Sequence, residues 1–112
     1  MAPGDKSYNH LLGARLVAQD GQFLGIISFE KFNPDSINNK TGEYGNHFKP
    51  FSIVNELGKY GSSFSPYSAF NEQAQLPPKI VLADRFIAYL TCNQMLSPRI
   101  DPRELLDWLD GK

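Results

Sequence analysis

SINNKTGEYGNHFKPF, residues 36–51, and SIVNELGKYGSSFSPY, residues 52–67, are two consecutive copies of one pattern. A third copy begins with SAFN at residue 68, again after 16 residues. The shared unit reads F-x-P-x-S-[IA]-x-N, and the first two copies close with G-x-Y-G. Because several residue types recur at one fixed interval, we interpret the middle of the chain as an internal repeat. It is shorter than the roughly 20 to 50 residues of common solenoid repeats.

Each copy carries the signals of a short helical turn followed by a bend. The proline presets its own φ and keeps the preceding residue out of the helical region. The serine two positions later is a preferred N-cap, and the asparagine three residues after it can answer in the manner of a capping box. Gly42 and Gly58 suit a left-handed helix end, and Gly45 and Gly61 suit a second bend. We therefore expect residues 32–74 to form a coil of short capped helical turns.

Aromatic residues are frequent in this coil, which argues against a flexible linker. Disordered segments are rich in charged residues and poor in phenylalanine, because they cannot bury enough apolar surface to fold. We expect the apolar positions to recur on one side, so that successive turns stack. These positions are Phe48, Phe51, Ile53, Tyr60, Phe64, Tyr67 and Phe70.

The segment before the repeat predicts a β-hairpin over residues 14–29. Asp20-Gly21 is a strong hairpin signal and lies between two apolar runs. A type I′ turn at this dipeptide would place Ala18 opposite Phe23.

The segment after the repeat predicts a second hairpin over residues 79–93. Pro77-Pro78 leads into it, and Asp84-Arg85 is the expected bend. The two hairpins together would form a small antiparallel sheet of four strands.

The C-terminal residues 101–110 have a full helix start signal. Asp101 is the expected N-cap, Pro102 occupies the first helical position, and Glu104 follows three residues after the cap. Leu105, Trp108 and Leu109 would form one apolar stripe that packs on the sheet. The prediction is a single α+β domain over residues 1–112, with two hairpins, the coil between them and this helix.

Composition excludes several classes of partner. The chain has 112 residues, a formal net charge of -1 and 21% charged residues, so it lacks the excess of lysine and arginine that binds phosphates. Neither a signal-like apolar run nor a stretch of about 20 apolar residues occurs. One cysteine rules out an intrachain disulfide and suits a reducing compartment. We expect a cytoplasmic protein that binds neither nucleic acid nor membrane.

No constellation of residues predicts catalysis or metal binding. Cys92 with His47 or His10 would supply a thiol nucleophile and a base, but nothing in the sequence positions them together. Cys92 falls on the strand face of Phe86 and Leu90, where a lone cysteine is usually a small buried hydrophobe. The spacings typical of zinc and calcium sites do not occur. We therefore expect no catalytic residue, no metal and no cofactor.

Tyr44, His47 and Tyr60 are the predicted binding residues. Tyrosine contributes large contact area at low entropic cost, and His47 interrupts the repeat where the next copy has Ser63. The main hypothesis is a non-enzymatic binding or protein-interaction module, whose partner is another protein or a second copy of the chain. One alternative is a small-molecule-binding protein or small enzyme that uses His47, and less so Cys92, in a pocket between coil and sheet. Another is a structural subunit whose C-terminal helix stripe docks on a larger partner.

The repeat and the segment after it resemble an uncharacterised bacterial family with tandem S-x-x-N and Tyr-Gly units before a Pro-Pro-led strand pair. The resemblance covers roughly residues 20 to 95. It is carried by Ser36 to Asn39, Tyr44-Gly45, Ser52 to Asn55, Tyr60-Gly61, Ser68 to Asn71, Pro77-Pro78 and Tyr89 to Asn93. The chain departs from the family pattern at Thr41, at His47 and at Gln73 to Gln75. Since this family has no established activity, the resemblance implies a shared fold and no catalytic residue.

Overall fold

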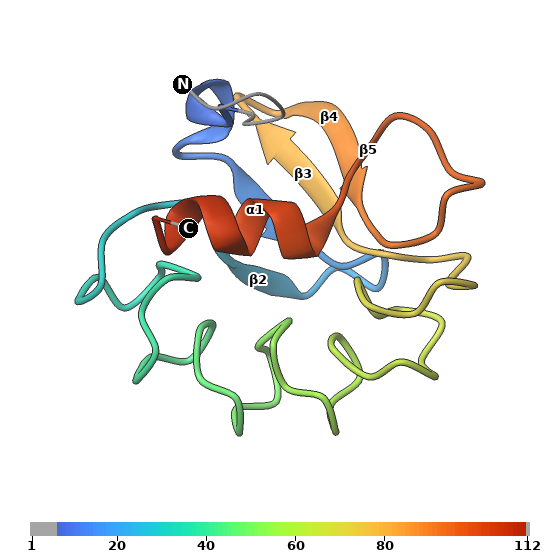
Figure 1. The fold of residues 1–112 in the computed structure, drawn as a ribbon, viewed down its shortest axis with the longest axis horizontal. Helices are drawn as coiled ribbons and strands as arrows, with labels where there is room; N and C mark the ends of the chain where they lie inside the picture. The colour runs from blue at the N-terminus through green and yellow to red at the C-terminus, as the bar shows by residue number, and fades with distance from the viewer. Residues whose placement is uncertain (1–6, 112) are drawn as a thin grey trace.

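A five-stranded mixed sheet with strand order β2-β1-β3-β4-β5 is the centre of the fold (Figure 1). The computed structural model describes residues 7–111. Its elements are a 3-10 helix η1 (Asn9–Leu11), β1 (Arg15–Val17), β2 (Phe23–Ile26), β3 (Lys79–Leu82), β4 (Arg85–Leu90), β5 (Arg99–Ile100) and α1 (Pro102–Leu109). β5 runs parallel to β4, and the other neighbouring strands are antiparallel. The chain is thus a small α+β domain, with one strand more than the sequence predicted.

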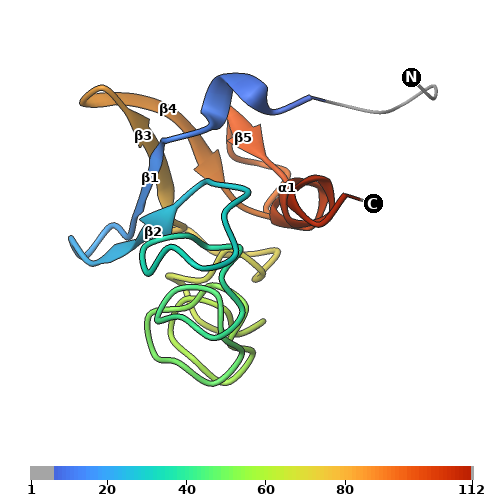
Figure 2. The same cartoon turned by 90° about the vertical axis from the view of Figure 1, so that its left-hand side faces the viewer.

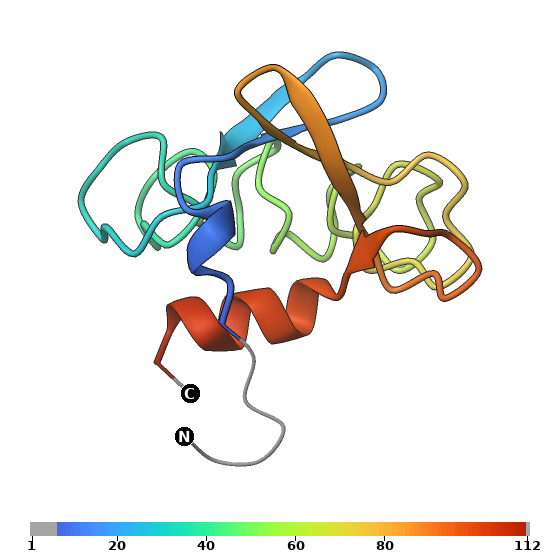
Figure 3. The ribbon, with the colours of Figure 1, turned by 90° about the horizontal axis from the view of Figure 1, so that it is seen from above.

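The C-terminal helix is confirmed, and its apolar stripe is covered. The Asp101 carboxylate accepts a hydrogen bond from the Arg103 amide at 2.8 Å, as an N-cap does. Leu105 and Leu109 are buried in the core. The Trp108 ring contacts the ring of Tyr8 beside η1, with centroids 5.7 Å apart, and Figure 3 shows η1 next to α1. Because this stripe packs within the chain, it is not available to a larger partner.

The loop between β1 and β2 differs from the expected type I′ turn. The Gly21 amide donates to the Ala18 carbonyl at 2.9 Å, and the Ala18 amide donates to the Gln22 carbonyl at 2.8 Å. Gly21 alone adopts a positive φ in this loop, and Phe23 pairs with Val17. A three-residue loop with a glycine in the left-handed region has this geometry, so the predicted pairing of Ala18 with Phe23 was wrong by one residue.

The loop between β3 and β4 lies one residue earlier than predicted. Leu82 pairs with Arg85, which leaves Ala83 and Asp84 as the two loop residues. Both have positive φ, at 50° and 62°, as the two central positions of a type I′ turn require. The absence of glycine here hid the turn from sequence reasoning, because alanine rarely adopts this conformation.

Residues between β2 and β3 form a coil of reverse turns, and the expected short helices are absent from it. Regular structure in this part of the described chain is limited to one isolated bridge between Ile26 and Ser36. Backbone hydrogen bonds link the Asn55 amide to the Ser52 carbonyl at 3.2 Å, and the Gly58 amide to the Asn55 carbonyl at 3.0 Å. Each of these bonds joins an amide to the carbonyl three residues earlier and closes a single turn, without the consecutive bonds that a helix would have.

Side chains of serine and asparagine explain why the chain turns here. The Ser36, Ser52 and Ser68 hydroxyls each accept the amide two residues later, at 3.1, 3.3 and 3.0 Å. The repeat asparagines accept an amide two residues later, and each donates to the carbonyl six residues earlier at 3.0 Å. Serine and asparagine side chains that bond to nearby backbone compete with the helical hydrogen-bond pattern. The capping-box role expected for asparagine was wrong.

The repeat glycines are required by close packing of successive passes of the chain. None of Gly42, Gly45, Gly58 and Gly61 has a positive φ, so the left-handed conformation predicted for Gly42 and Gly58 was wrong. A Cβ at Gly45 would overlap the Asn39 carbonyl and lie 2.8 Å from the Ile37 oxygen.

The second copy behaves in the same way. A Cβ at Gly61 would overlap the Asn55 carbonyl and lie 2.5 Å from the Ile53 oxygen. The Ala69 amide then donates to the Tyr60 carbonyl at 3.2 Å. At Gly45 and Gly61 the chain thus packs against its own backbone a few residues earlier; Figure 2 views this coil along its length.

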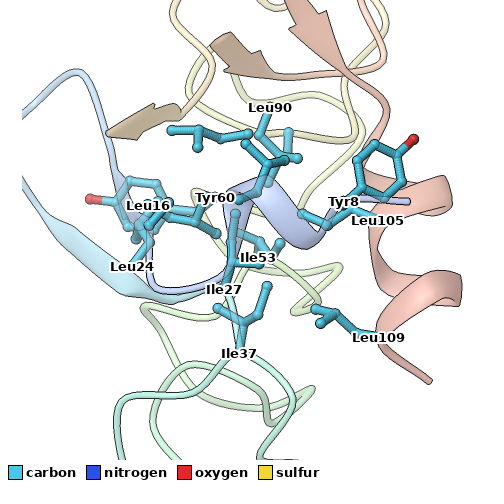
Figure 4. Close-up of a cluster of buried hydrophobic side chains, with 14 of the residues drawn as sticks. Tyr8, Leu16, Leu24, Ile27, Ile37, Ile53, Tyr60, Leu90, Leu105 and Leu109 are labelled. Atoms are coloured by element: carbon cyan, nitrogen blue, oxygen red, sulfur yellow. The ribbon is translucent and has the colours of Figure 1, made fainter. Parts of the chain in front are cut away.

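The core lies where the sheet, α1 and the inner side of the coil meet (Figure 4). The sheet contributes Leu16, Leu24, Ile80 and Leu90; β2 is followed by buried Ile27; α1 contributes Leu105 and Leu109; and the coil contributes Ile37, Ile53, Tyr60 and Ala69. Phe48 and Phe64 were expected to join this side, but both are exposed. The prediction of one apolar side for all coil positions was therefore wrong.

Candidate functional site

Tyr44 joins the coil to the sheet. Its ring meets the Phe23 ring of β2 edge-on, with centroids 5.0 Å apart and an interplanar angle of 75°. The Tyr44 Cβ lies so close to Gly25 that a side chain at position 25 would come within 2.8 Å of it. Burial raises the pKa of the Tyr44 hydroxyl. This tyrosine is half-buried and serves the packing of coil on sheet.

Tyr60 is a core residue with a polar anchor. The ring is buried, and the hydroxyl donates to the Asp20 carboxylate at 2.7 Å. Lys59 contacts the same carboxylate oxygen at 2.7 Å. Burial and the hydrogen bond to Asp20 raise the pKa of Tyr60 to about 12. Lys59 and Tyr60 therefore hold the coil against the loop between β1 and β2.

Asp20 is the common acceptor of this cluster. Burial alone would raise the pKa of its carboxyl, but the hydrogen bonds from Lys59 and Tyr60 hold that pKa at about 2. Asp20 was predicted as a turn residue, and it also takes part in this long-range contact, which no local pattern marks.

His47 lies apart from the two tyrosines, on a groove between the coil and α1. Its Nδ1 is 3.1 Å from the Val54 carbonyl oxygen, and because a carbonyl only accepts, Nδ1 carries the proton of this hydrogen bond. The groove has a volume of roughly 370 Å³ and includes Phe70 and Leu106 among its lining residues. It is thus formed by the coil and the helix, where the sequence-based alternative placed a pocket between coil and sheet.

Cys92 does not line this groove. The thiol is buried just beyond the end of β4, and its sulfur accepts a hydrogen bond from Arg103 Nη2 at 3.1 Å. Burial raises the pKa of the Cys92 thiol, and Arg103 only partly opposes this effect. Cys92 is thus buried, as the sequence predicted, and a buried thiol with a raised pKa is a poor nucleophile.

The structure does not bring Tyr44, His47 and Tyr60 together on one contact surface. The two tyrosines pack the coil against β2 and its preceding loop, whereas His47 faces the groove beside α1. Tyr60 cannot present its ring to a partner without leaving the core.

Sequence reasoning missed a row of exposed phenylalanines on the coil. Phe32, Phe48 and Phe64 are 93%, 86% and 89% exposed, and they occupy the same position in the three copies of the repeat. We call these three residues the phenylalanine row. The signal was present in the F-x-P spacing, but periodicity alone does not tell an inner position from an outer one.

Equivalent hydrogen bonds hold the backbone beside each member of the row. The residue directly after each phenylalanine accepts a hydrogen bond through its carbonyl from the repeat asparagine, at 3.0 Å in all three copies. The Phe48 amide donates to Asn46 at 2.8 Å, and the Phe64 amide donates to Ser62 at 3.1 Å. Because the local backbone is held in the same way, the side chains project from equivalent corners of the coil.

Comparison of the chain with protein-family models, with curated proteins and with solved structures finds no match. Within residues 7–111 there is no helix with the length and apolar character needed to cross a membrane. The same residues hold no group of three or more His, Cys, Asp or Glu side chains placed to bind a metal ion. The resemblance to the bacterial repeat family stays a prediction.

Proposed function

We propose that this protein is a non-enzymatic protein-interaction module that presents the phenylalanine row to its partner. The observation that carries the proposal is the exposure of Phe32, Phe48 and Phe64, each 86% or more, at equivalent places on the coil. Single exposed apolar residues are normal on protein surfaces, but grouped ones mark interaction sites. Aromatic side chains are also enriched among the residues that dominate binding energy at interfaces.

The coil supplies the scaffold for this surface in our proposal. Ser52 and Asn55 are buried and hold consecutive turns through side-chain hydrogen bonds. Ile37 and Ile53 fasten the inner side to the core. A partner would therefore meet aromatic side chains on a pre-organised backbone, which lowers the entropy lost on binding.

Site-specific photo-crosslinking tests the proposal. The photoreactive residue p-benzoylphenylalanine replaces Phe48 in one variant and Met95 in a control, because Met95 is also apolar and 89% exposed but lies outside the row. In cells that make the protein, we expect discrete adducts from position 48 and none of the same mass from position 95. Replacing Phe32 and Phe64 by serine should abolish the adducts. Equal adducts from both positions, or none from position 48, would contradict the proposal.

A small-molecule site in the groove beside α1 is a second candidate function. It is favoured by one observation: the groove of roughly 370 Å³ combines the apolar Phe70 and Leu106 with the imidazole of His47. An NMR screen with small neutral and anionic aromatic fragments tests it. We expect amide shifts at Val54 and Phe70 that His47→Ala weakens. Fragments that leave these amides unshifted would remove this candidate.

A further inference from the structure

We infer that the partner of the phenylalanine row is a second copy of this chain, bound about a two-fold axis with the two rows antiparallel. The inference rests on the proposed function, since it names the occupant of the same surface. Two observations support it: the spacing of the row and the area it exposes.

The spacing makes the row complementary to itself. Phe32, Phe48 and Phe64 are separated by 16 residues each, and equivalent hydrogen bonds hold each position. A two-fold axis that passes beside Phe48 would place each Phe32 opposite the partner's Phe64. All three side chains of one row then meet those of the other in one register, as an isologous interface requires.

The exposed aromatic area is close to what a dimer needs. A phenylalanine side chain offers about 150–250 Å² when it is fully buried, so the three members of the row supply roughly 400–650 Å² for each chain. A stable interface of standard size buries about 800 Å² on each partner. The row would thus supply half or more of that area, and the inference requires the coil residues around it to supply the rest.

The charges at the two ends of the row do not oppose the antiparallel arrangement. Lys31 directly precedes Phe32 and lies beside Glu30. Glu72 and Arg103 line the same surface hollow as Phe64. Each end therefore carries one charge of each sign. The two Lys49 side chains near the axis repel each other, but exposed charges in water interact weakly.

Sedimentation velocity of the full chain over a series of protein concentrations tests the inference. The unsubstituted chain and the control Met95→Asp should move from the mass of one chain toward that of two as concentration rises. Phe48→Asp should weaken self-association at least about 30-fold, because it places a carboxylate at the centre of the interface. Equal urea midpoints for the two variants at low concentration would show that Phe48→Asp is folded.

The outcomes separate this inference from the proposed function. A monomer at every concentration overturns the inference, and so does a dimer that Phe48→Asp leaves intact. If the photoreactive residue at position 48 links the chain only to other polypeptides, the inference fails while the proposed function stands. Row-dependent flotation of a monomer with vesicles of anionic phospholipid would identify a membrane surface as the occupant, and would overturn both.

Discussion

The inner and outer sides of the coil carry apolar residues with the same 16-residue period, yet only the inner side is core. Ile37, Ile53 and Ala69 are 1% exposed or less, whereas Phe48 and Phe64 are almost fully exposed. The sheet and α1 cover the inner side and leave the outer side open (Figure 2). The difference shows that a repeated pattern can carry two apolar faces of which only one packs in the core, and the other is the face that we propose binds a partner.

Truncation of one residue on each side would test the contrast most directly. Ile53→Ala should lower the free energy of unfolding by about 3 kcal/mol, because it leaves a cavity in a fully buried site. Phe48→Ala should change it by less than about 0.5 kcal/mol at low protein concentration, since its ring contacts solvent. Urea unfolding of the two variants gives both values, and similar losses would show that the outer side also stabilises the fold.

A methyl group where the coil backbone packs closely should lower the free energy of unfolding nearly as much as Ile53→Ala does. Gly61→Ala places a Cβ on the Asn55 carbonyl, so backbone atoms must move, and we expect a loss of about 2–3 kcal/mol. Gly58→Ala is the milder comparison, because its Cβ would lie 3.1 Å from the Asn55 side-chain nitrogen and would overlap no backbone atom. A thermal melt in which Gly58→Ala has a lower melting temperature than Gly61→Ala would refute close packing as the reason for these glycines.

Asparagine substitutions compare the buried hydrogen bonds of the inner side of the coil with the exposed ones of its outer side. Asn55→Ala removes the donor to the Lys49 carbonyl and the acceptor of the Leu57 amide, which should cost about 2 kcal/mol because Asn55 is buried. Asn46→Ala removes bonds to Lys40 and Phe48 that are exposed to water, and should cost less than about 1 kcal/mol. Urea titration of both variants compares them; equal costs would mean that burial does not distinguish the two sides.

The contact of the coil with Asp20 should appear as a pH dependence. The pKa of this carboxyl is about 2 in the folded chain and 3.8 in its ordinary state, so its contribution is complete above pH 3.8 and is lost as the pH falls through about 2. Asp20→Asn should remove about 1 kcal/mol at neutral pH and flatten the stability profile in this window. The control Asp84→Asn, at an exposed ion pair with Arg15, should leave the profile unchanged. An Asp20→Asn profile as steep as that of the unsubstituted chain would exclude this role.

Local sequence signals predicted the elements whose hydrogen bonds are local. The N-cap at Asp101 and the serine acceptors of the coil lie where the pattern placed them, since each bonds an amide two residues away. β5 was missed because two residues carry no periodicity and pair with β4 only after a loop. The turn at Ala83 and Asp84 was predicted one residue too late, because alanine rarely adopts a left-handed backbone conformation.

The surroundings of the predicted binding residues could not be predicted from the sequence, for a related reason. Tyr44 and Tyr60 were chosen for their residue type, but their surroundings are set by β2 and by the loop before it. The groove beside His47 depends on α1, about 60 residues later in the chain.

By itself the sequence determined the 16-residue period, the corners at which the coil turns and the start of the C-terminal helix. These features depend on hydrogen bonds that a side chain makes within a few residues of its own backbone. Only the tertiary structure decided that Ile53 is core and Phe48 is surface, and that Gly61 must lack a side chain. Burial and close approach depend on segments far apart in the chain, so no local pattern encodes them.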